Sequence, residues 1–224
     1  MKAGVLGIVD DSFEVVDSFT ETITEGDHEL GRCLVIDRVF STPDGEMAFA
    51  GRAAAETLVT DTDARIEDGE IHVTDRDRTV TRHTEFVGIP GEFVVVGSGN
   101  GTFAFDLIAE DTNTTIERTT LDLDQFFESH ESATPWRAGF YSTDESAVSG
   151  TFHGDDLRAT HDLETHLQNS NLNQIGLSYS YDDGALEVKM TASRSGYVEV
   201  YRPTEFDSGH YLAYLQDEIV PHVR

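Results

Sequence analysis

The sequence predicts an α+β protein built mainly from antiparallel β-hairpins, with two or three helices that include one at the C-terminus. Short runs of β-branched and aromatic residues alternate with polar residues along much of the chain, as in half-buried strands. Two Asp-Gly pairs, Asp68-Gly69 and Asp183-Gly184, separate such runs and are typical of hairpin turns. At residues 211–220, apolar side chains repeat at helical spacing instead.

The first third of the chain predicts strands and one ambiguous segment. Strands are expected at residues 1–9, 13–24 and 34–40. A turn follows, in which Pro43 sets the first central position and Gly45 supplies a positive φ. Residues 47–59 combine an Ala-rich centre that suits a helix with flanks that suit a strand, so their pattern does not decide between the two.

The middle of the chain predicts a hairpin, a buried strand and a short helix. The hairpin spans residues 65–73 around Asp68-Gly69. The apolar run at residues 92–96 predicts a buried strand, and the glycine-rich residues 97–101 predict a hairpin turn rather than a phosphate-binding loop, because a P-loop lysine is missing. Further strands are expected at residues 102–109 and 114–123, and a helix at residues 124–130 with Asp122 or Asp124 near its cap.

A polar stretch at residues 129–135 ends in proline and is the best candidate for a domain boundary or a long loop. It divides the chain into a β-rich part, residues 1–130, and an α+β part, residues 131–224, which can also form one continuous domain. In the second part we expect strands at residues 136–142, 148–153 and 196–201, a hairpin of residues 175–181 and 186–191, and helices at residues 155–170 and 211–220.

The charge of the chain predicts its surroundings better than its activity. Asp and Glu number 43 against 15 Lys and Arg, which gives a formal net charge of -28. Such a domain repels itself in dilute buffer, whereas molar salt shrinks the Debye length to about 3 Å. The composition resembles that of cytosolic proteins from salt-in halophiles, so we expect a cytoplasmic protein of a halophile. No apolar run approaches the roughly 20 residues of a membrane span.

The densest group of metal-ligand residue types lies at residues 153–166. Its candidate ligands are His153, Asp155, Asp156, His161 and His166. Imidazole and carboxylate together can bind Zn, Mn or Fe. The spacing of His161 and His166 does not match a HExxH helix, and acidic residues are frequent throughout the chain. The sequence therefore predicts no cofactor and leaves a divalent metal as the alternative.

One strand carries a pair with nuclease-like spacing. Glu187 and Lys189 project from the same face, and in PD-(D/E)xK nucleases acidic residues hold a divalent cation while a lysine orients the attacking water. The only acids across the turn are Asp182 and Asp183, and no Pro-Asp precedes them at suitable spacing. A divalent-metal hydrolase or nuclease is therefore the second hypothesis for function.

Two groups of residues are candidate binding surfaces. Arg76, Arg78 and Arg82 share a strand face that could hold a phosphate or an acidic peptide, although neighbouring acids favour ion pairs within the chain. Aromatic residues suited to an interface include Trp136, Tyr197 and Tyr201.

The first hypothesis for function is a non-enzymatic interaction or assembly protein that binds a protein partner, or a second copy, through sheet edges and this aromatic surface. A nucleic-acid-associated protein is the weaker alternative, since the net negative charge disfavours it.

Overall fold

A single twisted sheet organises the chain. The computed structural model describes residues 1–224 apart from residues 15, 143–148, 160–169 and 183. The strands of the first half are β1 Ala3–Asp10, β2 Phe19–Glu25, β3 His28–Ser41, β4 Met47–Glu67, β5 Glu70–Ile89, β6 Phe93–Val96 and β7 Thr115–Arg118. Those of the second half are β8 Thr134–Ser142, β9 Ser149–His153, β10 Ser170–Tyr181, β11 Leu186–Ser193 and β12 Tyr197–Arg202.

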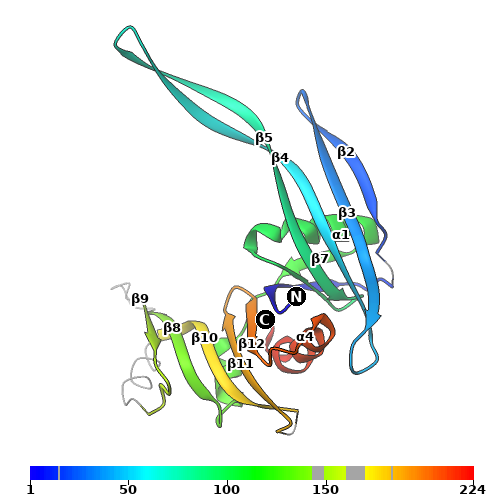
Figure 1. Ribbon diagram of the computed structural model, residues 1–224, viewed down its shortest axis with the longest axis vertical. Helices are drawn as coiled ribbons and strands as arrows, with labels where there is room; N and C mark the ends of the chain where they lie inside the picture. Colours follow the sequence, from blue (N-terminus) through cyan, green and yellow to red (C-terminus); the bar gives the residue numbers. More distant parts are fainter. Residues whose placement is uncertain (15, 143–148, 160–169, 183) are drawn as a thin grey trace.

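The strand order is β2-β3-β4-β5-β6-β1-β12-β11-β10-β8-β9, with β7 paired to β1. All of the pairings are antiparallel. The N-terminal strand β1 lies at the centre, where it pairs with β6 on one side and with β12 and β7 on the other. Strands from the two halves of the sequence thus meet at β1 in one continuous sheet (Figure 1).

In the described part of the chain, three α-helices pack on this sheet. They are α1 Phe103–Thr112, α2 Leu123–Ser129 and α4 Ser208–Tyr214, and α4 continues as a π-helical turn, Leu215–Ile219, and a 3₁₀ turn, Val220–His222. The α+β class and the C-terminal helix predicted from the sequence are confirmed. None of the helices in the described part of the chain is long and apolar enough to span a membrane.

The helices enclose two hydrophobic cores, one on each face of the central strands. Val94 and Val96 of β6 pack with α1, whereas Phe93 and Val95 point to the other core, which contains α2 and the C-terminal helix. A strand covered on both faces is apolar at every position. This explains the uninterrupted apolar run from Phe93 to Val96, where no residue is more than marginally exposed.

A hairpin turn and a helix cap form as the sequence predicts. Asp68 and Gly69 both adopt positive φ, 51° and 83°, and close the β4–β5 hairpin with a two-residue turn. At α2, the carboxylate of Asp122 accepts a hydrogen bond from the Gln125 backbone N–H at 3.1 Å. This contact satisfies one of the free donors at the start of the helix.

The structure resolves one undecided segment and differs from two expected elements. Residues 47–59 belong to a strand that extends to Glu67. Residues 102–109, expected as a strand, form most of helix α1, because Ala104, Phe105, Leu107 and Ile108 lie at helical spacing and bury one side against the sheet. The glycine-rich segment before them therefore connects a strand to a helix and is not a hairpin turn.

The helix expected at residues 155–170 is not found where the structure describes this segment. Residues 155–159 have no regular structure, and Ser170 already begins strand β10. The intervening residues lie outside the described part of the chain.

Candidate interaction surface

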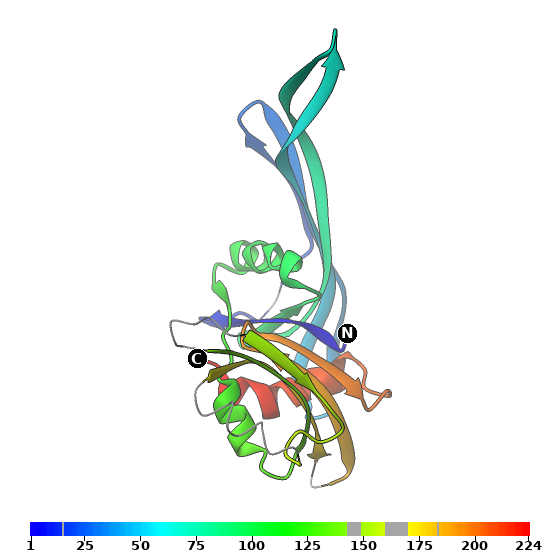
Figure 2. The same cartoon turned by 90° about the vertical axis from the view of Figure 1, so that its left-hand side faces the viewer.

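A two-stranded arm projects from the body of the molecule (Figures 1 and 2). We define the arm as residues 56–81, the part of the β4–β5 hairpin that pairs with itself alone in the described structure. Strand β3 accompanies β4 only as far as Ala55, and β6 accompanies β5 only from Phe86 onwards. Every residue from Val59 to Thr79 is exposed. At the usual rise per residue, β4 extends about 40 Å beyond the sheet.

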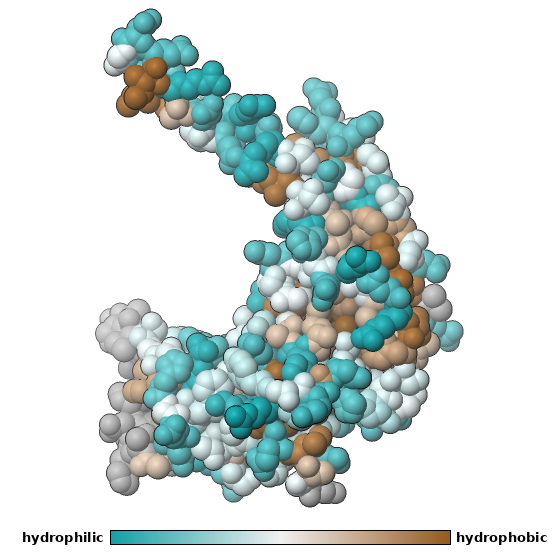
Figure 3. Space-filling model, in the orientation of Figure 1, coloured by the Kyte–Doolittle hydropathy of each residue, from teal (hydrophilic) through white to brown (hydrophobic). Residues whose placement is uncertain are grey.

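One face of the arm is apolar near its end. The register opposes Ile66 to Ile71 and Ala64 to Val73, so these four side chains share a face. Ile66 is 80% exposed, Ile71 73% and Val73 61%. Figure 3 shows this apolar patch surrounded by hydrophilic residues at the end of the arm. A contiguous exposed apolar patch of this kind marks an interaction site more often than scattered apolar residues do.

The same face becomes polar towards the body. The Thr60 hydroxyl donates to Asp77 at 2.7 Å, and the Thr62 hydroxyl donates to Asp75 at 3.1 Å. These cross-strand hydrogen bonds stabilise the register where, among the described residues, no third strand or helix supports the hairpin. These polar pairs therefore fix the strand register between the apolar patch and the body of the molecule.

Arginine side chains occupy the opposite face. The register places Arg76, Arg78 and Arg82 on this face of β5, together with Arg65 of β4. Arg78 forms an ion pair with Asp61 across the strands, and the Arg82 guanidinium lies 5.6 Å from the ring centroid of Phe103. The predicted shared face is thus present, and ion pairing within the chain accounts for part of its charge.

A groove of about 880 Å³ lies at the base of the arm, between the β2–β3 hairpin, β4 and α1. Its half-buried apolar lining comes from Ile23, Phe103 and Ala109. Acidic residues surround this lining, with Asp11, Glu25, Asp106 and Glu110 exposed. Within the groove, Arg32 is already bound to Glu110 at 2.8 Å. The groove therefore combines an apolar floor with a mainly acidic rim, to which exposed Arg82 adds one positive charge.

The predicted aromatic residues gather on the C-terminal half of the sheet. Trp136 and Tyr201 meet edge to face, with ring centroids 5.8 Å apart. The hydroxyls of Tyr197 and Tyr201 both donate to Glu199, at 3.2 and 3.1 Å. Burial, followed by the charge of Glu199, raises the pKa of Tyr197 to about 12. The Tyr197 hydroxyl therefore remains a protonated donor. The surface is only partly open, since Tyr201 is 38% exposed.

The nuclease-like pair has other partners in the structure. Glu187 accepts a hydrogen bond from the Ser180 hydroxyl at 2.7 Å, and the Lys189 ammonium lies 4.5 Å from the ring centroid of Trp136. Both residues belong to β11 and project from one face, as the strand alternation requires. Lys189 thus makes a cation–π contact, and Glu187 accepts a cross-strand hydrogen bond.

The candidate metal ligands are only partly described. His153 ends strand β9, and Asp155 and Asp156 follow it in an exposed segment where Asp156 accepts a hydrogen bond from the Arg158 backbone N–H. His161 and His166 lie outside the described residues. Within the residues that are described, no group of three or more His, Cys, Asp or Glu side chains could hold a metal ion. The metal site stays a prediction.

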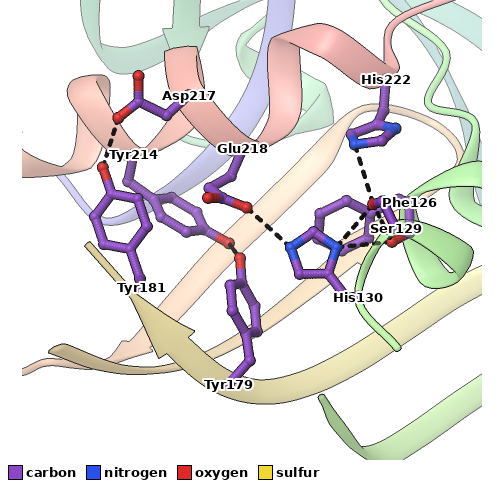
Figure 4. A network of polar contacts seen from close by, with 9 residues as sticks. All are labelled: Phe126, Ser129, His130, Tyr179, Tyr181, Tyr214, Asp217, Glu218 and His222. Carbon is purple, nitrogen blue, oxygen red and sulfur yellow. Dashed lines mark hydrogen bonds and ion pairs between the residues drawn. The ribbon is translucent and has the colours of Figure 1, made fainter. Parts of the chain in front are cut away.

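A polar cluster that the sequence did not indicate joins α2, β10 and the C-terminal helix (Figure 4). The hydroxyls of Tyr179 and Tyr214 lie 2.7 Å apart, and the Tyr181 hydroxyl donates to Asp217 at 2.7 Å. Burial raises the pKa of Tyr179 and Tyr214, so both hydroxyls stay protonated. These contacts connect strand β10 to the last helix of the chain.

A serine, a histidine and a glutamate also meet in this cluster. His130 Nε2 lies 2.9 Å from Glu218, and His130 Nδ1 lies 3.0 Å from the Ser129 hydroxyl (Figure 4). However, the Ser129 hydroxyl donates to the Phe126 carbonyl at 2.9 Å, and His130 Nδ1 lies 2.8 Å from the same oxygen. Both side chains thus lie within hydrogen-bond distance of a backbone carbonyl at the end of α2. This arrangement stabilises the end of the helix.

Sequence reasoning identified the β4–β5 hairpin but missed its exposed apolar end. The missed residues are Ile66, Ile71 and Val73. Their alternation with charged neighbours predicts a half-buried strand face, and only the sheet order reveals that no other strand of the described structure covers it. The chain matches no family model, and a search of curated proteins finds no similar protein.

Proposed function

We propose that this protein is a non-enzymatic interaction or assembly protein that binds a protein partner through the arm, with sheet edges and the aromatic surface as further contacts. One observation carries the proposal. Ile66, Ile71 and Val73 share a face at the end of a hairpin that projects alone from the sheet, and each is more than half exposed. Apolar side chains in this position lose contact with water only when another molecule covers them.

The stability of the arm gives a second physical reason. An isolated two-stranded hairpin is marginally stable in water, and its open edges offer unpaired backbone groups to other strands. The arm has charged and hydroxyl side chains along its length and at its turn, which protect its edges from unspecific pairing, but they leave the apolar face near its end uncovered. A bound partner would stabilise the arm and cover the apolar patch at once.

The expected setting is the cytoplasm of a halophile. The formal charge of -28 supports this, because the self-repulsion of such a surface is weak only where salt is concentrated. A protein partner fits this setting better than nucleic acid does. A β-ribbon can enter a DNA groove, but the turn of this arm carries Glu67, Asp68 and Glu70, which phosphates would repel.

Site-specific photo-crosslinking in cells that produce the protein tests the proposal. A benzophenone amino acid replaces Ile71 in one variant and Glu128, an exposed residue of α2, in a control variant. We expect protein adducts at position 71 and few or none at position 128. Equal yields at both positions, or the absence of adducts at position 71, would contradict the proposal.

A further inference from the structure

We propose that the partner of the arm is a second copy of this chain, and that the end of each arm docks in the groove at the base of the other arm. This inference rests on the proposed function, because it names the partner for the same surface. It commits to a closed dimer in which each copy supplies one arm end and one groove.

The apolar surfaces of the two sites complement each other. The end of the arm presents Ile66, Ile71 and Val73 on one face. The groove offers half-buried Ile23 and Phe103 between the β2–β3 hairpin and α1, in a volume of about 880 Å³. This volume accommodates several aliphatic side chains. Burying apolar surface on both sides is the largest favourable contribution to most protein association.

The charges of the two sites also complement each other. Arg65 and Arg76 lie on the arginine face of the arm, opposite the apolar patch, and are exposed; Arg65 also forms an ion pair with Asp63 at 3.3 Å. The exposed rim of the groove carries Asp11, Glu25 and Asp106. In a chain with a net charge of -28, the arginine face is a local exception that suits an acidic surface. Complementary charges at the edge of an interface favour the correct partner and orientation.

The length of the arm allows two copies to exchange their arms. The end of the arm lies about 40 Å from its own base along an extended hairpin, so it cannot fold back into the groove of the same copy. When two arms run antiparallel and overlap along their length, each end reaches the base of the other arm. A twofold axis then makes both contacts identical and closes the assembly.

Disulfide trapping between differently tagged copies tests the contact. Both copies carry Cys33→Ser, which removes the native thiol; one carries Ile71→Cys at the arm end and the other carries Ala109→Cys in the groove. The control replaces Ile71→Cys by Val39→Cys, because Val39 is an apolar residue of β3 that is 63% exposed and lies outside the arm and the groove. Mild oxidation should join positions 71 and 109 at least tenfold faster than positions 39 and 109. Equal rates would overturn the inference.

Sedimentation in molar KCl supplies a second measurement. Wild type should sediment as a dimer of the 24.7 kDa chain at micromolar concentration. The double variant Ile66→Thr/Ile71→Thr should dissociate at least ten times more readily, whereas Val39→Thr should not.

A wild-type protein that remains monomeric at about 100 µM would overturn the second-copy inference. If photo-crosslinking at position 71 then yielded adducts with a different protein, the proposed function would stand while this inference fell. If it yielded no adducts at all, both would fall.

Discussion

The buried hydroxyl pair Tyr179–Tyr214 allows a prediction whose size follows from the structure. Tyr214 is fully buried and Tyr179 is 7% exposed, and their hydroxyl oxygens lie 2.7 Å apart. Tyr214→Phe removes one partner and leaves the Tyr179 hydroxyl buried without its hydrogen bond. Leaving one buried polar group unsatisfied costs about 1–3 kcal/mol. Tyr179→Phe should cost a similar amount for the same reason.

The double variant Tyr179→Phe/Tyr214→Phe should recover most of this loss, because it leaves no unpaired hydroxyl and keeps both rings. A coupling free energy of about 2–6 kcal/mol between the two sites, the sum of the two single losses, is therefore expected. For a chain of this length each kcal/mol corresponds to roughly 2–4 °C in Tm. Each single variant should thus melt about 2–12 °C below wild type, and the double variant close to it.

Urea unfolding in molar KCl, followed by the fluorescence of the only tryptophan, Trp136, measures the four free energies of this cycle. Circular dichroism provides a second probe that tests for two-state behaviour. Additive losses, with the double variant destabilised by the sum of the two single variants, would refute the reasoning. So would two single variants as stable as wild type.

Three further predictions concern stability. Gly51→Ala should cost about 1–3 kcal/mol in urea unfolding, since a Cβ there would lie 2.2 Å from the Val35 carbonyl oxygen and 2.6 Å from the Phe86 ring; a variant as stable as wild type would contradict it. Asp122→Ala should cost about 0.5–2 kcal/mol near neutral pH. Burial opposes the ionised form of Asp122, but the Gln125 N–H and Arg224 lower its pKa below the usual 3.8, so this contribution is present above about pH 4 and is lost as the pH falls through the folded-state pKa. A difference between wild type and variant that stays constant in urea titrations from pH 6 to 3 would refute this assignment. Lowering KCl from about 2 M to 0.1 M, where the Debye length grows from less than 3 Å to about 10 Å, should lower the free energy of unfolding, and an unchanged value would contradict the halophilic setting.

Local signals predicted much of this fold, and distant pairing explains where they failed. Asp68-Gly69 specified its hairpin because two positive φ angles at a two-residue turn suit few other residue pairs. The strand expected at residues 102–109 is wrong, although the spacing of Phe105, Leu107 and Ile108 already fits a helix that is buried on one side. The preceding glycine-rich segment favours a turn between two strands, and this local signal conflicts with the helical spacing that follows it.

The candidate site was harder to predict than the fold. The shared face of Arg76, Arg78 and Arg82 followed from strand alternation alone. The exposure of Ile66 and Ile71 did not, because it depends on β3 and β6 ending their pairing before the arm begins. Where β3 and β6 stop pairing depends on contacts between strands that are distant in the sequence. The periodicity of the arm residues does not reveal it.

Hydrogen exchange of the arm amides tests the central claim most directly. The measurement compares peptides covering residues 59–79 in dilute purified protein and in the same protein added to a concentrated extract of the cells that produce it, both in molar KCl. Binding through the arm predicts that exchange in these peptides slows at least tenfold in the extract, while peptides from α2 do not change. Arm amides that exchange equally fast in both samples would contradict it.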